Sequence, residues 1–294
     1  MHCPRLHRQK FVAVLAAFAL TACGGGGGES PATAPTPVAS TNTLGCAANT
    51  SVRLSSGGNF GGKLLNNVWN AGAAGSFPWS QCLQEKRLGS MLAEVGWTWR
   101  WPDNGNQVYS YPSIVVGAKP WDGGPGNDAR FPRRIADTPR LLVSYDVDTT
   151  ATGNVNLATS IWFTRTVATP ATAAESEIST EIMVWSDYTP VLVSTTGPVT
   201  ERGEITVDGR AFRVFAAESW GDISGGSTHR WKFVVYVARQ TTRTLSFDAR
   251  RFIDDAIARG LLDPTHAVAN VELGNEISSG AGTTWVRAFS ITTP

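Results

Sequence analysis

Short runs of alternating apolar and polar residues recur along most of the chain, and clusters of Gly, Pro, Asn or Asp separate most of them. Alternation with a period of two is typical of half-buried β-strands. Asp-Gly in VDGR, 207–210, predicts a hairpin turn, because this pair tolerates the positive φ of a type I′ turn. Short strands at this spacing predict an all-β sandwich or a closed sheet. The segments expected to be strands are LLNNVWN, AEVGWTWRW, PSIVVGA, RLLVSYDVD, LATSIWFTR, TEIMVWS, EITVDG, RAFRVFAAE, WKFVVYVAR, AVANVEL and TWVRAFSIT.

One segment, SFDARRFIDDAIARGLL at 246–262, has helical rather than strand periodicity. Ser246 or Asp248 can cap its start, and Gly260 lies near its end. We therefore expect a single amphipathic helix packed against a sheet. The apolar residues at helical spacing are Phe252, Ile253, Ala256, Ile257 and Leu261.

The N-terminal part of the chain is unlike the rest. Residues 1–22 combine basic side chains with the apolar run FVAVLAAFAL, which is too short to span a bilayer as a mature helix and fits an export signal. LTAC follows directly and resembles the lipobox of bacterial lipoproteins, which implies lipidation of Cys23. The alternative is an ordinary cleaved signal with an unrelated cysteine. Residues 23–45 are rich in Gly, Pro, Ser and Thr and predict a tether, so the expected domain is 46–294.

These features predict an exported protein that acyl chains anchor to the cell envelope. If the cell has two membranes, Gly24 after the lipidated cysteine favours the outer one, by resemblance to known lipoprotein sorting. Without its basic signal the chain is close to neutral and has no basic stripe, which argues against a nucleic-acid partner. Cys46 and Cys82 remain in an oxidising setting and are expected to form a disulfide, the alternative being two buried thiols.

The chain has 11 tryptophans, and three of them, Trp97, Trp99 and Trp101, share one face of a predicted strand. Flat indole rings suit pyranose rings and ordinary cores equally well, so these residues do not decide the function.

The stretch EISTEIMVW places Glu181 on the same strand face as Met183 and Trp185. A glutamate is almost never fully buried unless it is paired or functional. In VELGNEISSGAG, Glu272 and Glu276 share a face if the strand continues. Two glutamates from separate strands can form an acid and nucleophile pair for cleaving glycosidic bonds. The alternative is two exposed or salt-bridged acids at sheet edges.

Four blocks of the sequence resemble glycoside hydrolase family 12, the small jelly-roll endoglucanases and xyloglucanases, over about 65–291. The resemblance implies two antiparallel sheets with one helix and a concave substrate groove. The blocks, in chain order, are NNVWNAGAAGSFPWSQC, WTWRWPDNGNQVYSYPSIVVG, TEIMVW and LGNEISSGAGTT.

The resemblance also implies residue roles. Glu181 corresponds to the nucleophile and Glu276 to the general acid/base of a retaining double displacement on β-1,4-glucans. Such chemistry needs no cofactor, and we expect none and no metal. The remaining residues that correspond to the family's substrate cleft are Asn67, Trp69, Met183 and Trp185.

One position departs from the family pattern. In NLATSIWFT, Ser160 replaces an aspartate that lies beside the family's nucleophile. A serine hydroxyl can still donate to Glu181 and favour its ionised form, but a negative charge is lost. We therefore predict an altered pH profile. The departure also supports an alternative, a non-catalytic carbohydrate-binding jelly roll. A third hypothesis, a structural surface protein, would not need two acids in a groove. We expect a monomer that binds a β-glucan polysaccharide.

Overall fold

The computed structural model describes residues 38–54, 60–103, 108–121, 126–167, 175–190, 199–222 and 226–294. The predicted signal, Cys23 and the tether up to residue 37 lie outside the described residues. Among the residues that are described, no helix is long and apolar enough to cross a membrane.

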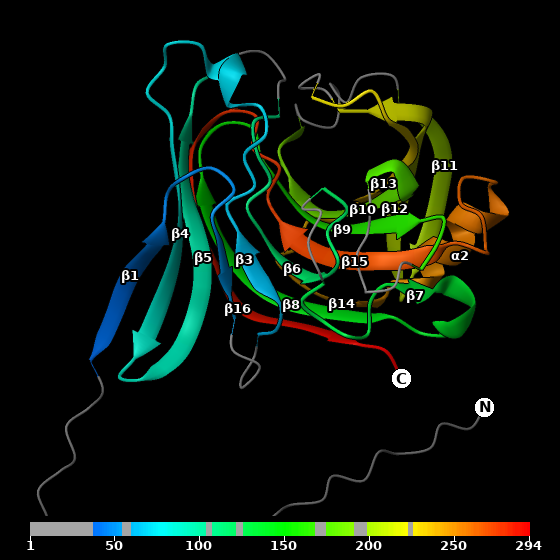
Figure 1. Cartoon of the computed structure of the whole chain (residues 1–294), viewed down its shortest axis with the longest axis horizontal. Coiled ribbons are helices and arrows are strands. Elements are labelled where there is room, and N and C mark those ends of the chain that lie inside the picture. The colour runs from blue at the N-terminus through cyan, green and yellow to red at the C-terminus, as the bar shows by residue number, and fades with distance from the viewer. Residues whose placement is uncertain are drawn as a thin grey trace, which may run out of the picture. The chain divides into compact units, whose positions relative to one another are not determined.

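The domain is a sandwich of two β-sheets, as the sequence predicts (Figure 1). The first sheet has six strands in the order β1-β4-β5-β16-β8-β14. These strands are β1 (Ala39–Gly45), β4 (Ser80–Leu88), β5 (Met91–Trp101), β8 (Leu142–Ala151), β14 (Thr244–Asp248) and β16 (Gly280–Thr292).

The second sheet has ten strands in the order β11-β12-β13-β10-β9-β15-β6-β3-β2, with β7 pairing β15 beside this path. In the described part of the chain, three short 3-10 helices, Ala71–Ala74, Ile135–Asp137 and Glu175–Glu177, lie in connections. The ten strands are β2 (Ser51–Arg53), β3 (Lys63–Leu65), β6 (Ser113–Gly117), β7 (Arg133–Arg134), β9 (Asn156–Thr164), β10 (Ile178–Tyr188), β11 (Thr200–Val207), β12 (Arg210–Gly221), β13 (Arg230–Ala238) and β15 (Ala267–Gly274).

One pairing differs from the two fully antiparallel sheets that were expected. β10 pairs with β13 in parallel, with Glu181 opposite Phe233 and Trp185 opposite Val237. Parallel neighbours need a long connection between them. Here β11 and β12 supply it, because the meander β11-β12-β13 follows β10 in the chain and then joins the sheet beside it. The hairpin predicted at VDGR is confirmed, since Asp208 and Gly209 have φ of 48° and 79° between paired Val207 and Arg210.

The core between the sheets explains why alternate residues of each strand are apolar. Its members come from both sheets, for example Val184 of β10 and Val286 of β16. Trp97, Trp99 and Trp101 are all buried in this core, which decides between the two roles that the sequence left open. The indole Nε1 of Trp97 donates to Asn275 Oδ1, and that of Trp101 donates to Gln81 Oε1.

The tether that was expected to reach residue 45 ends earlier. Ala39–Gly45 form β1, which pairs antiparallel with β4 and runs along the outside of the six-stranded sheet (Figure 1). Most side chains of β1 are exposed, so the strand has no apolar alternation that would reveal it in the sequence. Backbone hydrogen bonds to an existing strand, with Thr and Ser suited to extended backbone, are sufficient here.

The predicted amphipathic helix is present but shorter, because Thr244–Asp248 form β14 and only Arg250–Ala258 form α2. The helix buries Phe252, Ile253 and Ala256, and the Phe252 ring lies 4.7 Å from that of Tyr236 on β13. The N-cap residue is Ala249, without a side-chain cap, and not Ser246 or Asp248 as predicted; Asp248 Oδ1 nevertheless accepts a hydrogen bond from the Arg250 backbone N–H at the start of the helix.

Candidate active site

The outer face of the ten-stranded sheet carries the residues that the EISTEIMVW pattern singled out. Because side chains alternate along β10, Ile182 and Val184 enter the core while Glu181, Met183 and Trp185 lie on the opposite face. All three of these outer-face side chains are nevertheless buried, with Glu181 8% exposed.

Aromatic and aliphatic side chains surround this row on the outer face. Met183 and Trp185 form one apolar cluster with Tyr111, against which Trp69 packs. A second cluster contains Trp162 and Trp231, and the ring of Trp121 lies 5.6 Å and 5.3 Å from theirs. The face therefore presents aromatic rings on both sides of the Glu181 carboxylate. Trp185 Nε1 is among the buried donors that lack a hydrogen-bond partner within the described part of the chain.

Ser160 is hydrogen-bonded to Glu181. It lies on β9 opposite Met183 of β10, and its hydroxyl donates to Glu181 Oε1 at 2.9 Å. Ser160 is itself buried, so water does not compete strongly for this bond. The hydrogen bond that the sequence predicts from the serine hydroxyl to Glu181 is therefore present.

Glu276 reaches the same face from the loop that follows β15, and not from a strand. β15 ends at Gly274, so Glu276 is not part of the continuous strand that would have placed it on one face with Glu272. Asn156 at the start of β9 holds it instead, because its Nδ2 donates to Glu276 Oε2 at 2.6 Å and its Oδ1 accepts from the Glu276 backbone N–H at 2.8 Å. Asn275, which directly precedes Glu276, is also held by Asn156, because its Nδ2 donates to the backbone oxygen of Asn156 at 2.6 Å.

A third carboxylate on this face forms a buried ion pair that the sequence did not reveal. Glu272 Oε1 and Oε2 lie 2.7 Å and 2.8 Å from Lys119 Nζ, and the two side chains are 0% and 4% exposed. Asn270 Nδ2 and Ser113 Oγ also donate to Glu272, at 2.9 Å and 3.3 Å. The signal for this pair in the sequence is a lysine two residues after the apolar strand SIVVG.

Burial and mutual repulsion dominate the electrostatics of the two candidate catalytic glutamates. Burial raises the pKa of Glu181, the charge of Glu276 raises it further, and the Ser160 hydrogen bond opposes both. Burial also raises the pKa of Glu276, against the hydrogen bond from Asn156. Since each ionised carboxylate disfavours ionisation of the other, the pair loses its first proton well before its second. Such a pair can hold one proton at neutral pH and use it in acid/base chemistry.

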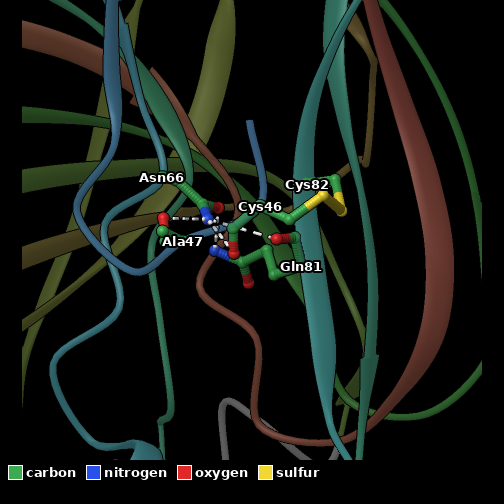
Figure 2. Close-up of a disulfide and its surroundings, with 5 residues drawn as sticks. All are labelled: Cys46, Ala47, Asn66, Gln81 and Cys82. Atoms are coloured by element: carbon green, nitrogen blue, oxygen red, sulfur yellow. Dashed lines mark hydrogen bonds between the residues drawn. A yellow bond between two sulfur atoms is a disulfide. The ribbon is translucent and has the colours of Figure 1, made fainter. Parts of the chain in front are cut away.

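The disulfide predicted between Cys46 and Cys82 is confirmed with an S–S distance of 2.01 Å, and the segment that carries Asn67 and Trp69 is tied to its surroundings by Asn66 (Figure 2). Beside the disulfide, Asn66 Nδ2 donates to Ala47 O at 3.0 Å and to the backbone oxygen of Gln81 at 3.1 Å.

This anchoring orients the two residues that follow. Asn67 and Trp69 are half-buried, and the backbone oxygen of Asn67 accepts from the Tyr111 N–H at 2.8 Å. Both residues therefore lie beside the outer-face cluster that contains Tyr111. Among the described residues, no three His, Cys, Asp or Glu side chains gather as ligands for a metal ion.

Comparison with known proteins agrees with this architecture. The sequence profile described as glycosyl hydrolase family 12 matches residues 63–293. Endoglucanase S of Pectobacterium parmentieri is 27% identical over 221 residues, which are 74% of this chain and 76% of that protein. A family 12 xyloglucanase from Bacillus licheniformis superposes with a TM-score of 0.70 at 23% identity, covering 87% of this chain and all of the other. An endoglucanase from Rhodothermus marinus gives a TM-score of 0.64 at 25% identity, covering 84% and 96%.

Proposed function

The chain belongs to glycosyl hydrolase family 12 and is a glycoside hydrolase, and we propose that it cleaves internal β-1,4 bonds of glucan polysaccharides with retention of configuration. Glu181 is the nucleophile and Glu276 the general acid/base. The observation that carries the proposal is the arrangement of the two carboxylates on one aromatic-lined sheet face, where Ser160 and Asn156 of the same strand, β9, donate to Glu181 and Glu276.

In the first step, ionised Glu181 attacks the anomeric carbon while protonated Glu276 donates its proton to the departing sugar oxygen. The Ser160 hydroxyl stabilises the carboxylate form of Glu181, which the attack requires. Asn156 orients the Glu276 carboxyl by binding both its side chain and its backbone N–H. Retention of configuration requires the two carboxyl groups to lie about 5–5.5 Å apart.

In the second step, water hydrolyses the glycosyl–Glu181 ester. Esterification removes the negative charge that raised the proton affinity of the pair, so Glu276 can now act as a base and take a proton from the water. Attack of water from the face that the leaving group occupied restores the original configuration. The free enzyme is regenerated with Glu181 ionised and Glu276 protonated.

The substrate class follows from the aromatic residues and from the relatives. Trp69 and Trp185 lie on the side of Glu181 where Tyr111 also packs, and indole faces suit the apolar faces of pyranose rings. The relatives named above are two endoglucanases and a xyloglucanase. We propose cellulose chains, mixed-linkage glucan or xyloglucan as substrates, and a monomeric enzyme.

The test is release of reducing ends from barley mixed-linkage glucan and from xyloglucan, with the anomeric form of the first product followed by proton NMR. Glu181→Gln and Glu276→Gln should each lose at least a hundredfold in activity, and the wild type should release the β-anomer. Glu94→Gln removes a carboxylate from the half-exposed ion pair with Lys86 and should retain activity. Release of the α-anomer, or an active Glu181→Gln variant, contradicts the proposed mechanism.

The alternative of a binding module without turnover rests on Ser160, which takes the place of the aspartate in the family pattern. It predicts that the wild type is as inactive as Glu181→Gln while both proteins are retarded equally in glucan-containing native gels. The hydrogen bond that Ser160 donates to Glu181 favours the enzyme instead, since it supports the ionised nucleophile.

We further propose that the mature protein is held at a membrane through Cys23. The support is the lipobox-like LTAC after an apolar run and the tether-like composition that follows. Labelling with a palmitate analogue in a bacterial host should mark the wild type and not Cys23→Ala. An unlabelled wild-type protein that is released to the medium would indicate an ordinary cleaved signal.

A further inference from the structure

The ion pair between Lys119 and Glu272 lies inside the outer face of the catalytic sheet. Lys119 follows β6 and Glu272 belongs to β15, which pairs with β6. Glu272 accepts hydrogen bonds from Lys119, Asn270 and Ser113, so its two oxygens have little freedom to move. The result is a rigid pair of opposite charges that bulk water does not reach.

Stability alone does not explain such a pair. Desolvation of two buried ions costs about as much as their attraction returns, and well-packed apolar residues of similar volume often serve equally well or better. A buried charge in an active-site sheet instead acts on its neighbours, because low polarity and exclusion of salt leave its field unscreened.

The strand register brings this field to the nucleophile. Glu272 lies directly opposite Ser160 on β9, and Ser160 lies opposite Met183 on β10 and donates to Glu181. Two strand spacings of about 4.8 Å separate β15 from β10, so Glu272 acts on Glu181 over roughly 10 Å, and the ammonium group of Lys119 is bound to that carboxylate. Ser160 is the polar residue between them.

We propose that Lys119 is a positioning residue that favours the ionised form of Glu181, because its charge offsets the opposing charge of Glu272, which in turn fixes the ammonium group. This inference rests on the proposed role of Glu181 as nucleophile. The two members of the pair have opposite effects on one proton equilibrium, and this distinguishes them from an ion pair that only supports the fold.

The two members of the ion pair have opposite effects on the pKa of Glu181, and the effect of Glu272 is the larger. After burial, the Glu276 charge and the Ser160 hydrogen bond, the remaining influences on the pKa of Glu181 are Glu272, which raises it, and Lys119, which lowers it. Tyr111, whose phenol donates to the Ala158 backbone oxygen, also faces these three carboxylates, and its own raised pKa keeps it neutral.

The experiment measures kcat/KM against pH on barley mixed-linkage glucan for Lys119→Met, Glu272→Gln and the double variant. The acidic limb of this profile reports ionisation of the nucleophile in the free enzyme. Lys119→Met should move that limb to higher pH and Glu272→Gln to lower pH, each by about one unit for a charge at this distance. The double variant should return close to the wild type, because both charges are removed.

Arg259→Met is the control for lost stability, since Arg259 pairs with Asp255 on the helix, away from the site. It should lower the melting temperature without moving either limb. Should Lys119→Met fail to fold, Glu272→Gln and the double variant decide: a shift to lower pH that the second substitution cancels supports the proposal.

The proposal for Lys119 is overturned if the limbs do not move, or if both single variants shift in the same direction. As long as Glu181→Gln remains inactive, such a result leaves the proposed function intact. An active Glu181→Gln variant overturns the proposed function itself, and with it the role of Lys119. The two failures are therefore distinguishable within one set of variants.

Discussion

Removing the Ser160 hydroxyl is a direct test of how the site keeps its nucleophile ionised. In Ser160→Ala, Glu181 loses the hydrogen bond that its Oε1 accepts at 2.9 Å inside a buried face. A hydrogen bond to a charged group contributes about 1.5–3 kcal/mol. Because one pKa unit corresponds to about 1.4 kcal/mol, the loss should raise the pKa of Glu181 by about one to two units.

The assay is the pH dependence of kcat/KM on a soluble glucan. The acidic limb should move to higher pH, so that activity falls about 10–100-fold one or two units below the limb and changes little well above it. Ser186→Ala is a matched control, since Ser186 is also buried on β10 but its hydroxyl contacts the Leu157 backbone oxygen. A limb that stays in place in Ser160→Ala, or moves equally in both variants, would refute the argument.

Three further predictions concern stability and the acid/base residue. Burial raises the native pKa of Glu181 and Glu276 above the usual 4.5, so the folded state holds protons that the unfolded chain releases, and stability falls as pH rises from 4.5 toward the native values. Glu181→Gln and Glu276→Gln should therefore raise the melting temperature near neutral pH and leave it almost unchanged below pH 4.5; equal shifts at both pH values would contradict this. Loss of the Cys46–Cys82 bond, which spans a sequence separation of 36, should lower the free energy of unfolding by about 3–4 kcal/mol in the loop-entropy model, as measured by urea titration of a double Ala variant. Asn156→Ala removes the hydrogen bond to Glu276 Oε2 and should move the basic limb of the pH profile to higher pH and lower kcat about tenfold; an unchanged basic limb would show that Asn156 does not influence the proton on Glu276.

The sequence predicts the fold well where apolar alternation is strong and poorly where it is absent. β10 and the hairpin at Asp208–Gly209 follow from local pattern and turn chemistry. β1 does not, because its side chains are mostly exposed and its stability comes from backbone pairing with β4. The parallel placement of β13 beside β10 is also absent from local pattern, since it depends on the path of a long connection.

The candidate site, like the fold, is predictable from the sequence only where a local pattern marks it. Glu181 stands out because an acid interrupts an apolar strand face, which is a local signal. Glu276 was expected to continue the strand of Glu272, but the strand stops at Gly274 and Asn156, from a distant segment, takes over its positioning. Contacts between residues more than a hundred positions apart leave no periodic trace in a single sequence.

The last two strands of the chain occupy interior places in both sheets, and this has a consequence for how the enzyme matures. β15 lies between β9 and β6, and β16 lies between β5 and β8. In a nascent chain that still lacks them, each sheet is divided into two parts with open edges, and each edge is a template for pairing with another molecule. Both sheets are therefore completed only when the final segment joins them. A protein shortened at its C-terminus would expose unpaired strand edges in the middle of each sheet, in addition to the edge strands of the full-length molecule.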